Sequence, residues 1–178
     1  MIGKVAVLAG LLGSAAYVMS NVTDEDPSVY PYSKDQVVGM LTTARTTLPR
    51  RDGDGTIEIW SAGRSGQGVT LNMRYDKGAP VLACQAVVTA VDADKSRVAA
   101  DCGAATSSTS ALSRTQAQLR VPMFAEHIEA TLRKRPFDRA NVDRGESAAV
   151  FQNLGGMQRE SLQRSAADRE AQRAATGR

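Results

Sequence analysis

Hydrophobic side chains recur along the chain with two different spacings, and each spacing predicts a different element. Between residues 33 and 48 they recur every three or four positions, which is typical of an amphipathic helix. Ser33 is a suitable N-cap, Gln36 completes a capping box, and Pro49 is expected to end the helix. The apolar face is formed by Val37, Val38, Leu41, Ala44 and Leu48. A helix with one such face requires a sheet or a second helix to pack on.

The spacing then changes to two, which predicts half-buried antiparallel strands. The two clearest strands are TIEIW, residues 56–60, and GVTLNMRYD, residues 68–76, joined by a glycine-rich segment. Their inward-facing positions are Ile57, Ile59, Val69, Leu71, Met73 and Tyr75. A weaker alternation over residues 116–121 predicts a further strand, although the same residue types also suit a helix.

A hairpin that carries both cysteines is predicted next. Two runs rich in β-branched residues flank a turn at residues 92–94. The register that follows places Val88 opposite Val98 and Cys84 opposite Cys102. Opposed antiparallel residues have Cα atoms about 4.5 to 5.5 Å apart, which a disulfide tolerates. We therefore expect a disulfide between the two cysteines, with two buried free thiols as the alternative.

A second amphipathic helix is predicted to begin at Pro122, with the sequence PMFAEHIEATLRKR. Phe124, Ile128 and Leu132 lie at intervals of four and therefore share one face. Residues 138–178 are rich in arginine, glutamine and acidic side chains and lack an apolar stripe. We expect them to form a polar tail that is disordered or loosely helical. A helix that forms only with a partner is the alternative.

Residues 1–20 have the pattern of an export signal. Lys4 supplies a positive n-region, residues 5–13 an apolar h-region, and the small Ser14 and Ala16 a cleavage site. An uncleaved membrane anchor is the main alternative, and a cytosolic helix is a third. In both leading interpretations the rest of the chain lies outside the cytosol, in the periplasm or at the periplasmic face of the inner membrane.

Length and composition limit the chain to one domain with extensions. It has 178 residues, of which 42% are hydrophobic and 23% charged, values that fit a soluble domain. The 22 Lys and Arg residues against 19 Asp and Glu give a net charge of only +3, so nucleic acid is not the expected partner. Residues 21–31 are acidic and contain proline, which predicts a linker before a folded domain over residues 32–137.

The expected fold class is therefore α+β. Its antiparallel sheet is expected to have four to six strands and to pack on a long C-terminal helix, with an N-terminal leader helix and a charged tail.

No motif in the sequence predicts catalysis. The glycine-rich loop at residues 63–68 leads into a strand rather than a helix, so a hairpin turn is favoured over a phosphate site. Asp52 and Asp54 resemble the start of a calcium loop, but Gly63 occupies the position that requires a bidentate glutamate. His127 is the only histidine, and we expect it to be solvated or half-buried on a surface helix. We therefore expect no catalytic, metal or cofactor site, and enzyme activity is disfavoured.

The order of the predicted elements resembles that of a known superfamily. A capped helix is followed by an antiparallel series and a terminal helix, with the sequences YSKDQVVGML, TIEIW, GVTLNMRY, VLACQAVVTAV, KSRVAADC and PMFAEHIEATLRKR. This order is similar to the helix-grip arrangement of the START and polyketide-cyclase-like superfamily, over roughly residues 30–137. The resemblance implies a curved sheet that wraps the C-terminal helix and holds an apolar ligand between them.

Two functions are consistent with these expectations. The first is a binding module outside the cytosol, in which the sheet and the last helix enclose a small apolar ligand. The residues expected to line that cavity are Ile57, Ile59, Val69, Leu71, Met73, Tyr75, Phe124 and Ile128. The alternative is an envelope structural or interaction protein with a solid core, whose charged tail engages a protein partner. An internal cavity of several hundred Å³ would support the first function, and a filled interior would argue against it.

Overall fold

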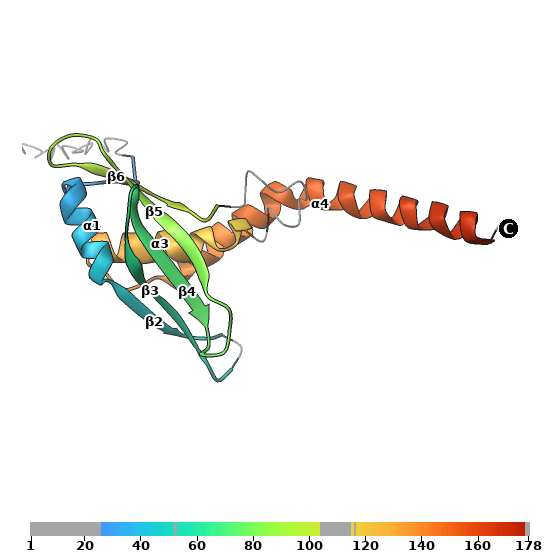
Figure 1. Ribbon diagram of the computed structural model, residues 1–178, viewed down its shortest axis with the longest axis horizontal. Coiled ribbons are helices and arrows are strands. Elements are labelled where there is room, and N and C mark those ends of the chain that lie inside the picture. Colours follow the sequence, from blue (N-terminus) through green and yellow to red (C-terminus); the bar gives the residue numbers. More distant parts are fainter. Residues whose placement is uncertain (1–25, 52, 104–114, 116, 177–178) are drawn as a thin grey trace, which may run out of the picture.

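The computed structural model describes residues 26–51, 53–103, 115 and 117–176. Within these, it has a six-stranded antiparallel sheet whose inner face is covered by α1 and α3, while α4 leaves the body as a long helix (Figure 1). The expected α+β class is confirmed. The strands are β1 (Val29–Tyr30), β2 (Arg45–Pro49), β3 (Thr56–Ser65), β4 (Gly68–Tyr75), β5 (Leu82–Ala90) and β6 (Ser96–Asp101). The helices are α1 (Lys34–Thr43), α3 (Val121–Leu132) and α4 (Arg139–Thr176).

The sheet order is β1-β6-β5-β4-β3-β2, so each strand from β2 to β6 lies beside the next one in the chain. The first strand lies in the segment that the sequence assigns to a linker. Val29 lies opposite Arg97 and Tyr30 opposite Ser96, which adds this short strand to the free edge of β6. Tyr30 is buried in the core, and burial of its ring fixes the chain just before α1.

Helix α1 begins as predicted and ends earlier than predicted. The Ser33 hydroxyl accepts from the Gln36 amide, and the Gln36 side chain accepts from the Ser33 amide, which completes the capping box. Ala44 already has an extended backbone, and Arg45–Pro49 form β2 instead of a last helical turn. The prediction of a helix up to Leu48 is therefore wrong. Pairing with β3 and a run of β-branched threonines favour the strand over the helix in this segment.

The glycine-rich segment between β3 and β4 is a hairpin turn, as predicted. Residues 66–67 form the turn, and Ser65 pairs with Gly68 across it. Gly68 has a φ of 153° and lies so close to the Ala86 carbonyl that a Cβ would collide with it. Glycine is therefore required at this position.

The β5–β6 hairpin has the predicted register. Ala86 lies opposite Ala100 and Val88 opposite Val98. Cys84 and Cys102 form a disulfide, with Cα atoms 4.1 Å apart and a sequence separation of 18 residues. The predicted disulfide is confirmed, and it links Cys102, which follows β6, to Cys84 within β5.

The strand predicted over residues 116–121 is wrong. Ala117 and Gln118 are helical, and the Leu119 amide donates to the Thr115 carbonyl at 2.9 Å, which is the spacing of an α-helical turn. Glutamine, leucine and arginine have high helix propensity, and the helix of α3 follows at Val121. The alternation of apolar residues here does not reflect a pleated strand.

Within the predicted polar tail, Arg139–Thr176 form the single helix α4. Val142 and Ala149, near its start, are buried, and the helix packs on α3 in this region. Its later turns are exposed and extend away from the body (Figure 1). The predicted leader, residues 1–20, lies outside the described residues. No helix in the described part of the chain is both long and apolar enough to cross a membrane.

Candidate functional site

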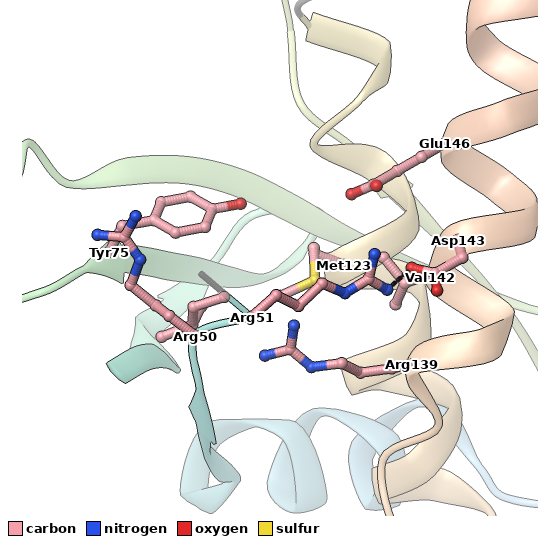
Figure 2. A pocket seen from close by; sticks show the side chains of 9 residues that line it. Arg50, Arg51, Tyr75, Met123, Arg139, Val142, Asp143 and Glu146 are labelled. Carbon is pink, nitrogen blue, oxygen red and sulfur yellow. Dashed lines mark hydrogen bonds and ion pairs between the residues drawn. The ribbon is translucent and has the colours of Figure 1, made fainter. Parts of the chain in front are cut away.

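A pocket of about 370 Å³ opens between the first turns of α4, the start of α3 and the connection from β2 to β3 (Figure 2). This volume lies in the range of small-molecule sites. The apolar residues that line it are Ile57, Tyr75, Met123 and Val142. The charged residues that line it are Arg50, Arg51, Arg139, Asp143 and Glu146. The pocket therefore combines an apolar floor with a charged rim.

The apolar floor is a continuation of the hydrophobic core. Ile57, Met123 and Val142 are each 5% exposed or less and belong to the core cluster. Helix α4 leaves this part of the core open because the other side chains that it directs toward the pocket are charged, namely Arg139, Asp143 and Glu146. Helix α4 therefore contributes Val142 to the apolar floor of the pocket and three charged side chains to its rim.

Two of the three arginines are paired with carboxylates of the protein. Arg50 forms an ion pair with Asp76 at 2.6 Å, and Asp76 also accepts from the Thr56 amide at 2.8 Å. Arg51 forms an ion pair with Asp143 of α4. These pairs hold the connection between β2 and β3 against the end of β4 and against α4.

The remaining charged groups of the pocket are Arg139 and Glu146. Arg139 donates to the Pro49 carbonyl, which leaves its positive charge without a carboxylate in an ion pair among the described residues. Glu146 forms no hydrogen bond or ion pair with any described residue, and its carboxylate points into the pocket (Figure 2). Burial, and then the charge of Asp143, raise the pKa of the Glu146 carboxyl.

The hydroxyl of Tyr75 points into the pocket from the opposite side to Glu146 (Figure 2). Burial, and then the negative charge of Glu146, raise the pKa of this hydroxyl. The tyrosine therefore remains a neutral hydrogen-bond donor, and its ring forms part of the apolar wall.

A second, more open hollow of about 400 Å³ adjoins the first along α4. It shares Arg51, Asp143 and Glu146 with the pocket. Its further lining residues are Leu119, Ser147, Val150 and Phe151. The two hollows together form a groove beside the first turns of α4.

The eight residues predicted to line a cavity are divided between this pocket and the core. Ile57 and Tyr75 line the pocket. The other six are buried in the core cluster: Ile59, Val69, Leu71, Met73, Phe124 and Ile128. Val37 and Leu41 of α1 share that cluster and are fully buried. Side chains from both helices therefore occupy the inner face of the sheet, and the pocket lies at its end.

His127 lies in the core, so the expectation of a solvated or half-buried histidine is wrong. Its side chain is fully buried, and Nδ1 lies 2.8 Å from the hydroxyl of Thr46. Nε2 is buried and has no hydrogen-bond partner among the residues that the structure describes. Burial lowers the pKa of His127 to about 4, so the ring is neutral at pH 7. The strand β2, which the sequence had assigned to a helix, supplies the threonine that covers this ring.

Glu126 is a buried carboxylate that the sequence interpretation did not identify. It is 2% exposed and accepts from Arg135 at 2.9 Å, from Asn141 at 2.9 Å and from the Asp138 amide at 2.7 Å. Burial alone would raise its pKa, but these hydrogen bonds hold it below the usual value. The network fixes the start of α4 against α3, and it thereby positions Arg139 and Glu146. A signal was present in the sequence, because Glu126 lies beside the apolar stripe and a basic cluster follows at residues 133–135.

Comparison with known proteins gives no relative on which to base a function. No family model, no curated protein sequence and no solved structure matches the chain. In the described part of the chain, histidine, cysteine and acidic side chains form no group of three that would hold a metal ion. The interpretation of the site therefore depends on its geometry and its charges.

Proposed function

We propose that this protein is a non-enzymatic binding module that holds a small ligand with an apolar body in the pocket beside α4. The observation that carries the proposal is the pocket of about 370 Å³, whose floor continues the core while its rim is charged. An apolar concave surface with a few polar groups is the usual form of a ligand site. The proposal keeps the ligand class expected from the sequence and moves the site from the inner face of the sheet to its end.

We also propose that the protein acts outside the cytosol, in the periplasm or at the periplasmic face of the inner membrane. The leader pattern of residues 1–20 supports export. The disulfide between Cys84 and Cys102 is compatible with an oxidising compartment.

A relation to the START and polyketide-cyclase-like superfamily is part of the same proposal. In that superfamily a first strand precedes the capped helix and a curved sheet wraps the C-terminal helix. Here β1 precedes α1, and the sheet packs on α3, which supports the relation.

Binding of 1-hexanol to the full chain, measured by ligand-observed NMR, tests the binding proposal. We expect Val142→Phe to reduce binding, because the larger side chain fills the pocket. Leu162→Phe is the matched control, since Leu162 is 68% exposed on the projecting part of α4, and it should bind as the wild type does. If Val142→Phe does not fold, Tyr75→Trp fills the same space from β4. Equal binding by the filled variants and the wild type would contradict the proposal.

A second candidate function is association through the projecting half of α4. Leu162 is 68% exposed on the projecting part of the helix, and Phe151, which is 76% exposed, lies before it beside the second hollow. Exposed apolar side chains of this size mark a candidate surface for contact with another chain. The occupant that fits best is a second copy of the chain, because residues 157–176 carry charges of both signs that an antiparallel copy would match: Arg159, Glu160, Arg164, Asp168, Arg169, Glu170 and Arg173.

Sedimentation of the full chain over a range of concentrations tests this second candidate. A dimer that the double variant Phe151→Ser and Leu162→Ser converts to monomer would support it. A wild-type chain that remains monomeric at every concentration would exclude it.

A further inference from the structure

We propose that the ligand of this pocket is a zwitterion, with its cationic group toward Glu146 and Tyr75 and its anionic group toward Arg139. The proposal rests on the binding function proposed above and narrows its ligand class.

The first step is the balance of charge around the pocket. Arg50 and Arg51 are each compensated by a carboxylate of the protein, Asp76 and Asp143 respectively. Arg139 and Glu146 remain, one positive and one negative, and neither forms an ion pair with a described residue. The pocket as a whole is thus nearly neutral, but one charge of each sign lies outside the ion pairs, and Glu146 is influenced by the charges of Arg51 and Arg139 without forming an ion pair with either.

The second step is the position of these two charges. Arg139 and Glu146 are seven residues apart on α4, so they share one face of the helix, with their Cα atoms roughly 10 Å apart. In Figure 2 their side chains enter the pocket from its two ends, and Met123, Val142 and the Arg51–Asp143 ion pair lie between them. A ligand that reaches both charges therefore passes over the side chains of Met123 and Val142 and beside an ion pair that is already neutralised.

The third step is the environment of the negative end. Glu146 is partly withdrawn from water and has no donor among the described residues, and burial raises the pKa of its carboxyl. An ammonium group placed there would supply both the missing donors and the opposite charge. The Tyr75 hydroxyl points into the pocket from the opposite side, and its oxygen can accept a hydrogen bond from the same ammonium group.

The two ends together disfavour a ligand with a single charge. A plain anion would pair with Arg139 and bring its apolar end against the Glu146 carboxylate, which would lose water without compensation. A plain cation would pair with Glu146 and bring its apolar end against the Arg139 guanidinium, which would likewise lose water without a compensating partner. Only a molecule with both charges compensates both ends.

A matched set of six-carbon probes tests this on the full chain: 6-aminohexanoate, hexanoate, hexylammonium and 1-hexanol. Titration followed by NMR gives the dissociation constant of each. We expect 6-aminohexanoate to bind about tenfold more tightly than either singly charged probe, the gain of one charge-assisted hydrogen bond. Glu146→Gln should reduce its affinity to that of hexanoate, and Arg139→Gln to that of hexylammonium.

Two controls and a conservative variant complete the experiment. Arg64→Gln on β3 and Glu170→Gln on the projecting part of α4 remove the same charges from exposed positions outside the pocket, and they should not change binding. Arg139→Lys retains the charge and should keep most of the preference. If the probes bind with equal affinity, or if a singly charged probe binds best, the zwitterion assignment is wrong while the binding function stands. If none of the four binds, the binding function itself is wrong, and the assignment fails with it.

Discussion

The inner face of the sheet and the end of the sheet have similar strand sequences but opposite roles. Along the inner face, Ile59, Leu71 and Met73 are fully buried, and α1 and α3 cover them with apolar side chains. At the end of the sheet, Ile57 and Tyr75 belong to the same two strands, but the element above them is α4, which presents charged residues. Whether the inward-facing residues of a strand become part of the core or line a pocket therefore depends on the helix that packs over them.

The largest expected effect lies in the filled region. Phe124→Ala should lower the free energy of unfolding by about 4 kcal/mol, because it removes a fully buried ring from a packed core. Phe151→Ala is the matched control, since Phe151 is 76% exposed, and it should cost less than about 0.5 kcal/mol. Urea denaturation of both variants measures the difference. Equal losses would show that the sheet face is not the better-packed region.

Removal of the disulfide is expected to have the next largest effect. The double variant Cys84→Ala and Cys102→Ala should lose about 3 kcal/mol, because the crosslink closes a loop with a separation of 18 residues and so restricts the unfolded chain. Denaturation with and without a reducing agent measures it. A loss below about 1 kcal/mol in the variant, or a wild type insensitive to reduction, would contradict a stabilising role.

Buried His127 should make the filled region sensitive to acid. Its pKa of about 4 in the folded protein lies below the unfolded value of about 6.5, so protons bind preferentially to the unfolded chain between these values. The contribution of His127 is complete above the unfolded pKa and is lost as pH falls through the folded one. Stability should drop by about 2 kcal/mol from pH 7 to pH 5. His127→Gln should reduce this drop in urea denaturation at the two pH values, and an unchanged pH dependence would contradict the assignment.

At the boundary between the two regions, Glu126→Ala should destabilise by about 1 to 2 kcal/mol. The substitution removes the acceptor for Arg135 and Asn141, but Arg135 remains partly exposed and can be hydrated. Hydrogen exchange should accelerate most in the first turns of α4, with little change in β4 and β5. Uniform acceleration across the sheet would show that the network supports the whole fold rather than the placement of α4.

The smallest effect is expected beyond the pocket. Gly155→Ala in α4 meets no neighbouring atom within 4 Å, so it should raise the stability of that helical segment by about 1 kcal/mol through helix propensity alone. The global free energy of unfolding should remain within about 0.5 kcal/mol of the wild-type value, because the added methyl group meets no neighbour and this part of α4 is bonded to the body only through Asn153 to Gln118 and Met157 to Thr115 among the described residues. Circular dichroism with urea denaturation separates the two quantities, and a clear change in global stability would contradict an independent projecting helix.

The sequence identified the elements whose pattern is set by local contacts. The capping box at Ser33, the alternation in β3 and β4 and the register of the cysteine hairpin all depend on neighbours in the chain or across a turn. The prediction from the sequence was wrong where contacts between residues far apart in the chain determine the secondary structure. Residues 45–49 join a sheet edge instead of α1, and residues 29–30 form a strand only because β6 offers a free edge.

The candidate site was only partly predictable for the same reason. Alternation places Ile57 and Tyr75 on the inner face, but it does not show which helix covers them. Glu146 and Arg139 lie in a segment whose composition suggests only a polar tail, and their role depends on the network of Glu126 that positions α4. The prediction of a solvated or half-buried His127 was wrong because Thr46, whose hydroxyl bonds to the buried ring, lies on a strand that the local pattern had assigned to a helix.

The most direct test of the central claim is to map where an apolar probe binds. Amide chemical shifts of the full chain are recorded during titration with 1-hexanol. We expect the largest changes beside α4, at the apolar residues that line the pocket: Ile57, Tyr75, Met123 and Val142. Changes centred instead on Leu71 and Phe124, or spread evenly over the surface, would contradict the placement of the site at the end of the sheet.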